Sequence, residues 1–334
     1  MKKILLIGLL LLTFSALAID AETGALHASN GDFKTAYNIW KVLAAEGDAK
    51  SQFYLGVLYE KGNGVDQDYP QALFWYIKAA EQGVARAYYN IGNMFFNGRG
   101  VSVDYKEATR RFQLSANLNY PPAEYNLAYM LEQGLVDKKN PDQAFKWYLK
   151  AAENGLPKAQ LKIAQAYETG VGIAKDRAKA IQWYEKASTH KETPEARYHL
   201  AMLYLDNETN EQKGIQLLRE AAEDGDRLAQ YQLGYLYGQG KKVKQDYEQA
   251  VFWYKRAAKQ QVADAQYLLC LSYSLGRGLP VDVVLAHVWC EAATKNKAEG
   301  AEEALKTIRE SMSSEQLQAA AKIAPILNPE TSPK

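Results

Sequence analysis

The stretch Ser51-Gln-Phe-Tyr-Leu-Gly-Val-Leu-Tyr59 decides the fold, because variants of it return along the chain at regular distances. The later copies begin at Ala87, Ala123, Ala159, Ala196, Ala229 and Ala265, with spacings of 36, 36, 36, 37, 33 and 36 residues. A fixed period in this range is typical of stacked repeat proteins, in which each unit contacts only its neighbours. The length of 334 residues therefore does not indicate separate globular domains.

Each period predicts two helices. In the first, helix A, apolar residues such as Phe53, Leu55 and Leu58 recur at helical spacing around a small residue. The small residue, which lets a partner helix approach closely, is Gly56, Gly92, Ala128, Ala164, Ala201, Gly234 or Cys270. The second helix, helix B, carries Trp75-Tyr76 and Ala79-Ala80 in the first copy. Aromatic rings that face small residues indicate an interlocking core rather than a cofactor site.

Helix B begins in each period at a side chain that can accept hydrogen bonds from the free N–H groups of the first turn. These predicted N-caps are Asp32, Asp68, Asp104, Asn140, Asp176, Asn210, Asp246 and Asp282. Before the cap stands a Gly-x-Gly turn, as in Gly62-Asn-Gly64. It follows a helix rather than a strand and lacks a third glycine, so it predicts a helix-ending turn and not a phosphate loop. Lys242 replaces the second glycine in the sixth copy.

Together these motifs resemble the Sel-one-like repeat family, a relative of the tetratricopeptide repeat, over about residues 24–297. The resemblance implies an all-α fold: a right-handed α/α solenoid of helix-turn-helix repeats that forms a tetratricopeptide-like superhelix. It also implies a scaffold for protein complexes. Bacterial members are often exported and act in envelope signalling, assembly or host contact, so we expect a partner protein or peptide rather than a small molecule.

The repeats and the ends predict five parts of the chain. Residues 1–18 form a signal peptide, and residues 19–48 form a capping helix pair, with helices over 25–29 and 33–46. Seven repeats occupy residues 49–84, 85–120, 121–156, 157–193, 194–226, 227–262 and 263–297. Residues 298–324 form C-terminal capping helices over 301–310 and 314–323, and residues 325–334 form a disordered tail.

The N-terminus has the pattern of a secretory signal. Lys2 and Lys3 precede an apolar run over residues 4–12, and Ala16-Leu-Ala18 fits the small-residue cleavage rule. We expect cleavage after Ala18, a mature chain that starts at Ile19, and a periplasmic or secreted protein without membrane insertion. An uncleaved anchor is the alternative, although the run is short beside the roughly 20 residues that span a bilayer.

Charge and motif content narrow the classes of function. Lys and Arg total 40 and Asp and Glu total 39, so no nucleic-acid binding is expected. The four histidines, His27, His190, His199 and His287, lie at different phases of the repeat and have no metal-ligand spacing. No catalytic motif is present, and we predict a protein without enzymatic activity, cofactor or metal.

The two cysteines fall in the last repeat. Cys270 occupies the small position of helix A, and Cys290 occupies the tyrosine position of helix B. Because both columns face the core, a Cys270–Cys290 disulfide is plausible in an oxidising compartment, and two buried thiols are the alternative. Cysteine-rich members of the family place their pairs elsewhere, so the penicillin-binding activity claimed for them does not carry over.

Two columns of helix A, three residues apart, vary from copy to copy, and packing therefore does not fix them. We call them the helix-A stripe. It consists of Tyr54, Val57, Asn90, Asn93, Asn126, Tyr129, Lys162, Gln165, His199, Met202, Gln232, Tyr235, Leu268 and Leu271. In repeats of this shape helix A lines the concave side, and amide and aromatic side chains suit protein contact. An ordinary solvated face is the alternative.

A glycan-binding protein or a β-lactamase-like hydrolase is the rival function, with Tyr54, Tyr129 and Tyr235 stacking on sugars.

Overall fold

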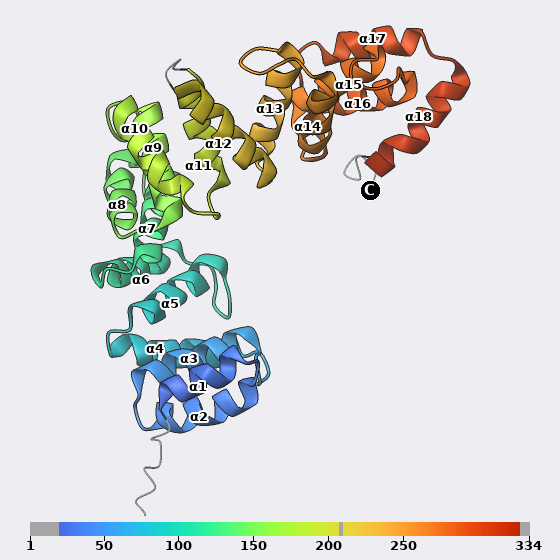
Figure 1. The fold of residues 1–334 in the computed structure, drawn as a ribbon. Helices are drawn as coiled ribbons and strands as arrows, with labels where there is room; N and C mark the ends of the chain where they lie inside the picture. The colour runs from blue at the N-terminus through green and yellow to red at the C-terminus, as the bar shows by residue number, and fades with distance from the viewer. Residues whose placement is uncertain (1–19, 207–209, 328–334) are drawn as a thin grey trace, which may run out of the picture. The chain divides into compact units, whose positions relative to one another are not determined.

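The computed structural model describes residues 20–206 and 210–327, and in these residues it contains eighteen helices and no strand. The chain divides into two compact units, residues 1–151 and 152–334. Figure 1 shows the helices of each unit stacked in chain order. Within each unit, helix A typically packs on the helix B of its own repeat, as α3 does on α4 and α13 on α14, and on the helix B of the repeat before it, as α5 does on α4 and α13 on α12. The predicted all-α class is therefore confirmed.

Unit 1 holds the N-terminal pair and the first three repeats. Its helices are α1 (Ala21–Ser29), α2 (Phe33–Ala45), α3 (Ala49–Lys61), α4 (Tyr69–Glu81), α5 (Ala85–Asn97), α6 (Tyr105–Asn117), α7 (Pro121–Gln133) and α8 (Pro141–Glu153), within which the unit ends.

Unit 2 holds the last four repeats and the C-terminal pair. Its helices are α9 (Pro157–Thr169), α10 (Arg177–Ser188), α11 (Pro194–Leu205), α12 (Glu211–Glu223), α13 (Arg227–Gln239), α14 (Tyr247–Lys259), α15 (Ala263–Leu275), α16 (Val283–Lys295), α17 (Ala301–Glu310) and α18 (Ser314–Leu327).

The core interlocks as the sequence predicts. Tyr76 and Phe112 are fully buried, and each ring lies over the small residue of helix A in its own repeat. A Cβ atom added to Gly56 would come within 2.7 Å of the Tyr76 ring, and one added to Gly92 would come within 2.6 Å of Phe112. The repeat therefore needs a small residue opposite each ring, and a larger one would displace the aromatic side chain.

The predicted caps are present at seven of the eight positions. The carboxylate or amide oxygen accepts a hydrogen bond from the backbone N–H three residues later at Asp32, Asp68, Asp104, Asn140, Asp176, Asp246 and Asp282. The prediction is wrong at Asn210, whose side chain makes no cap bond. Its ψ of 8° is not extended, whereas Asp104 has the extended ψ of 97° that presents a cap side chain to the first turn.

This difference predicts unequal costs of substitution. Asp104→Ala should lower the free energy of unfolding by about 1 kcal/mol, because it removes the bond to the N–H of Glu107. Asn210→Ala should leave stability within about 0.5 kcal/mol, because no cap bond is lost. Urea unfolding followed by circular dichroism measures both changes. Equal losses in the two variants would show that the cap bond is not the cause.

The turn glycines adopt the left-handed backbone that the sequence predicts. Gly62 and Gly64 have φ angles of 72° and 73°. At Gly64 space is also short, since an added Cβ would lie 2.7 Å from the carbonyl carbon of Phe33. In the sixth copy Lys242 keeps the same conformation, with φ of 67°, although it carries a side chain.

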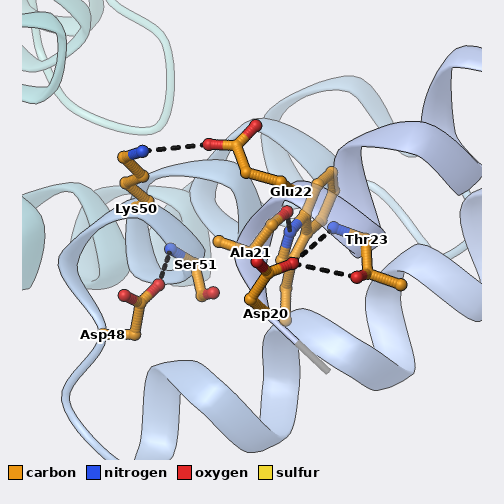
Figure 2. Close-up of polar contacts among 8 residues, drawn as sticks. Asp20, Ala21, Glu22, Thr23, Asp48, Lys50 and Ser51 are labelled. Carbon is orange, nitrogen blue, oxygen red and sulfur yellow. Dashed lines mark hydrogen bonds and ion pairs between the residues drawn. The ribbon is translucent and has the colours of Figure 1, made fainter. Parts of the chain in front are cut away.

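The N-terminal pair starts earlier than the predicted helix over 25–29. Asp20 caps α1, because its carboxylate accepts bonds from both the N–H and the hydroxyl of Thr23 at 2.9 Å (Figure 2). The Trp40 indole N–H donates to the carbonyl oxygen of Ala21 at 3.0 Å and holds this first turn on α2. The predicted signal peptide and its cleavage site before Ile19 lie outside the described residues.

The predicted C-terminal boundary is wrong within the described residues. Helix α18 continues through Pro325 to Leu327 instead of ending at residue 323. Proline lacks the N–H that would reach the carbonyl of Ala321, but Ala321 is exposed, so water can satisfy that carbonyl. The rest of the predicted tail, residues 328–334, lies outside the described residues.

Among the described helices, none has both the length and the apolar content that a membrane span requires.

Candidate protein-interaction surface

The helix-A stripe lies between core and surface. Tyr129 is exposed, with 37% of its surface accessible, and every other stripe residue is half-buried. No stripe residue is fully buried. The stripe residues differ in whether their side chains already contact another part of the fold.

Three stripe residues meet at one pocket in unit 1. Asn93 on α5 and Asn126 and Tyr129 on α7 line a pocket of about 340 Å³, together with Phe96, Asn97 and Tyr125. The Asn126 side-chain amide donates to the Asn93 side-chain oxygen at 3.3 Å, a long bond that joins the second and third repeats. The rings of Phe96 and Tyr129 stand edge to face, with centroids 6.4 Å apart. We call this the amide–aromatic pocket.

Tyr125, which lines this pocket, is supported by neighbouring residues of the fold. The ring of Tyr125 packs edge-on against Tyr148, with centroids 5.1 Å apart. The Tyr148 hydroxyl donates to the Glu132 carboxylate at 2.9 Å. Burial, with the carboxylate nearby, raises the pKa of Tyr148 above its ordinary value, so the phenol remains a donor at physiological pH. The Tyr125 side of the pocket is therefore held in place before any ligand binds.

The same tyrosine–glutamate pair recurs in other repeats. Tyr76 donates to Glu60 at 2.7 Å, and Tyr184 donates to Glu168. Burial raises the pKa of both phenols. Arg99 of the next repeat lies 3.3 Å from Glu60, so the pair also supports contact between repeats. These buried groups brace the repeat, and nothing in their geometry resembles a nucleophile beside a base.

The side chains of several other stripe residues already contact neighbouring residues of the fold. Tyr54 stacks on Trp40, with ring centroids 4.7 Å apart. His199 stacks on Tyr184 at 5.2 Å, and its Nδ1 lies 3.5 Å from Glu168. The Asn90 side chain acts on the Tyr76 hydroxyl and partly offsets the rise that burial causes in its pKa. These side chains support the repeat interfaces, which leaves less of each of them available to a partner.

The remaining stripe residues are packed to different degrees. Val57 packs against the core of the first two repeats, and Met202 packs against the core around the fifth and sixth repeats. Tyr235 and Leu268 pack against the core that contains the disulfide. The other half-buried members are Lys162, Gln165, Gln232 and Leu271.

The two-column pattern missed half of the pocket. Phe96, Asn97 and Tyr125 line it but do not belong to the stripe. A signal for two of them was present, since Asn97 lies four residues after Asn93 and Tyr125 four residues before Tyr129. Residues four apart share one face of a helix. Extending each column by one turn would have included them.

The last repeat contains the disulfide that the cysteine positions made plausible. Cys270 on α15 and Cys290 on α16 are bonded, with Cα atoms 5.2 Å apart, and both are fully buried. The alternative of two buried thiols therefore does not apply.

Within the described part of the chain, no group of three or more His, Cys, Asp or Glu residues could hold a metal ion.

Comparison with known families assigns the repeat. The model of the Sel1 repeat matches seven successive segments, residues 49–84, 85–120, 121–156, 157–191, 194–226, 227–262 and 263–297. The chain is a Sel1 repeat protein. The resemblance seen in the sequence is thus confirmed, and so is the fold class of an α-helical repeat solenoid. Sel1 repeat proteins generally mediate protein–protein interactions and are generally non-catalytic.

Solved structures agree with this assignment. A protective antigen present in uropathogenic Escherichia coli strains, which displays an SLR fold, is 30% identical, with 92% of this chain and 75% of that chain covered and a TM-score of 0.68. A Sel1 repeat protein from Oxalobacter formigenes is 28% identical, with 87% of each chain covered and a TM-score of 0.68. No curated protein gives a significant sequence match.

Proposed function

We propose that this Sel1 repeat protein is a non-catalytic, exported adaptor that binds a segment of a partner protein on its helix-A stripe, the face that we expect to be concave. The observation that carries the proposal is the amide–aromatic pocket, where Asn93, Asn126 and Tyr129 converge on a preformed cavity. The ligand class is an extended peptide with an apolar side chain.

The pocket has the chemistry that such a ligand needs. A side-chain amide offers both a donor and an acceptor, which match the C=O and N–H of a peptide bond. The Asn93–Asn126 bond is long, at 3.3 Å, so exchanging it for bonds to a peptide loses little. Phe96 and Tyr129 form an aromatic wall for an apolar side chain, and aromatic anchors commonly dominate interface energies.

Export is supported by two independent features. The N-terminal sequence has the charged, apolar and small-residue regions of a cleavable signal. A buried disulfide in the last repeat fits an oxidising compartment. The E. coli protein of similar structure is a protective antigen, which agrees with a role in envelope assembly or regulation or in contact with a host.

The rival reading, a glycan binder or hydrolase, draws on the same aromatic rings. Sugars stack on such rings, but glycoside hydrolysis requires a pair of carboxyl groups beside the scissile bond. No Asp or Glu lines the amide–aromatic pocket. The peptide therefore fits the pocket better, and the glycan becomes an outcome of the test.

Affinity capture from native envelope tests the proposal. The mature chain is compared with Asn93→Ala/Asn126→Ala/Tyr129→Ala and with the control Gln71→Ala/Gln143→Ala, which changes two exposed residues of α4 and α8 outside the helix-A stripe and the pocket. We expect a protein that the mature chain and the control capture, and that the triple variant binds at least about tenfold more weakly. Equal capture by all three chains would contradict the pocket. Binding of soluble peptidoglycan fragments in place of any protein would favour the rival.

A further inference from the structure

The junction of the fifth and sixth repeats departs from the repeat pattern. Helix α11 ends at Leu205 and α12 begins at Glu211, whereas α3 ends at Lys61 and α4 begins only at Tyr69. The turn after α13 carries Lys242 where the first, second, fourth and seventh repeats have glycine. An added Cβ at Gly64, Gly100 or Gly278 would overlap the preceding repeat. Lys242 shows that the corresponding space at this junction is open.

The open space is a pocket of about 1020 Å³ between α12 and the turn from α13 to α14. Its charged side chains are mostly cationic: Lys213 and Arg219 come from α12, and Lys242 and Lys244 come from the turn. Asp246 is the single carboxylate of the lining, and it already caps α14 by accepting a bond from Gln249 N–H at 2.9 Å. We call this the basic pocket, and no residue of the helix-A stripe lines it.

Two of the four cations have carboxylate partners. Lys242 lies 2.6 Å from Glu211, and Lys213 lies 3.4 Å from Glu185. Arg219 and Lys244 are exposed and have no carboxylate within ion-pair distance in the described part of the chain. The whole chain has a net charge of only +1, so this concentration of positive charge is local.

The backbone at Lys242 points to a role beyond packing. A lysine in the left-handed region costs roughly 1 kcal/mol that a glycine would not. Every other copy with a second turn glycine avoids this cost. Asn119, Gln261 and Lys297 adopt the same conformation at other turns, so it is the combination of this conformation with a charge that lines an open pocket that favours a binding surface at Lys242.

We propose that the basic pocket is a second docking site, which takes an acidic segment of a partner protein. Arg219 and Lys244 provide unpaired positive charge for its carboxylates, and Ile215 and Val243 provide an apolar floor for the side chains between them. A nucleic acid fits less well, because the pocket spans a single repeat junction and two of its cations already have carboxylate partners.

Fluorescence anisotropy with labelled peptides tests the site. The probe is three copies of Ser-Glu-Leu-Glu, and its control has glutamine in place of every glutamate. We expect the mature chain to bind the acidic probe and not the control probe. Arg219→Gln/Lys244→Gln should weaken binding about tenfold. The matched variant Lys34→Gln/Lys106→Gln, which removes two exposed lysines from unit 1, should bind as the unchanged chain does.

Three outcomes would overturn the proposal. Equal losses in the two double variants would mean a general effect of net charge. Equal binding of the two probes would mean that acidity is not recognised. Tighter binding of a single-stranded oligonucleotide than of the acidic probe, at the same salt concentration, would make the surface a nucleic-acid site. None of these variants touches the amide–aromatic pocket, so this test and the envelope capture can fail independently.

Discussion

Replacing Lys150 by methionine should lower the free energy of unfolding by about 3 kcal/mol. The Lys150 ammonium lies 3.0 Å from the carboxylate of Glu124, which has no exposed surface. Methionine keeps most of the side-chain volume but removes the charge. The carboxylate then loses the ammonium partner while it stays buried, and removing one member of a buried ion pair is among the costliest changes that a single substitution can make.

Comparison among the repeats explains why this pair exists. At the position of Glu124 the first, fourth, sixth and seventh copies have glutamine, whose amide donates to a carbonyl near the end of the preceding helix B. The bonds run from Gln52 to Ala44, Gln160 to Ala152, Gln230 to Ala222 and Gln266 to Ala258. A glutamate carboxylate cannot donate. Lys150 takes over this function in the third copy, because it donates to the equivalent carbonyl of Ala116 at 3.2 Å.

The double variant Glu124→Gln/Lys150→Met should therefore regain most of the lost stability. The glutamine removes the buried charge and restores the amide donor that four other copies use. Lys146→Met, an exposed change on the same helix, is the control and should stay within about 0.5 kcal/mol. Urea unfolding curves give the three values. A double variant as unstable as Lys150→Met alone would show that the buried charge is not the source of the cost.

The same comparison shows what a sequence can predict in a repeat protein. Spacing predicted the helix pairs, since the interlock of Tyr76 with Gly56 returns as Phe112 with Gly92 and as Tyr254 with Gly234. The N-cap was predictable at seven positions, because the cap bond joins a side chain to the backbone N–H only three residues later and therefore depends on local sequence. The cap at Asn210 was not, because it depends on a backbone conformation that residue type alone does not set.

Features that depend on a single tertiary partner were beyond the sequence. The early start of α1 requires the Trp40 indole, nineteen residues away, to reach the Ala21 carbonyl. The sequence did not show which residues of the helix-A stripe are accessible: Tyr54 stacks on Trp40, whereas Tyr129 remains exposed. Lys242 was visible as an exception to the glycine pattern, but the open space beside it was not. A period predicts what the copies share, and the candidate sites lie where they differ.

Reduction of the Cys270–Cys290 disulfide should lower the free energy of unfolding by about 3 kcal/mol and lower the melting temperature. The bond joins residues 20 apart in sequence, and closing a loop of this size restricts the unfolded chain by about that amount. The last repeat depends on it for a further reason. Cys290 stands where five of the other six copies place a buried aromatic ring, so the bond replaces the contact between ring and small residue that holds helix A to helix B in copies such as the first.

Thermal unfolding with and without dithiothreitol measures the effect, under denaturing conditions mild enough for the reductant to reach the buried bond. The variant Cys270→Ala/Cys290→Ala is the control, because its melting temperature should already be low and should not respond to reductant. Matching melting temperatures for the reduced chain and this variant would assign the whole effect to the crosslink. An unchanged melting temperature in the reduced chain, with free thiols confirmed by alkylation, would contradict the prediction. Helix packing alone would then hold the last repeat together, even though it lacks the aromatic ring that most other copies have at this position.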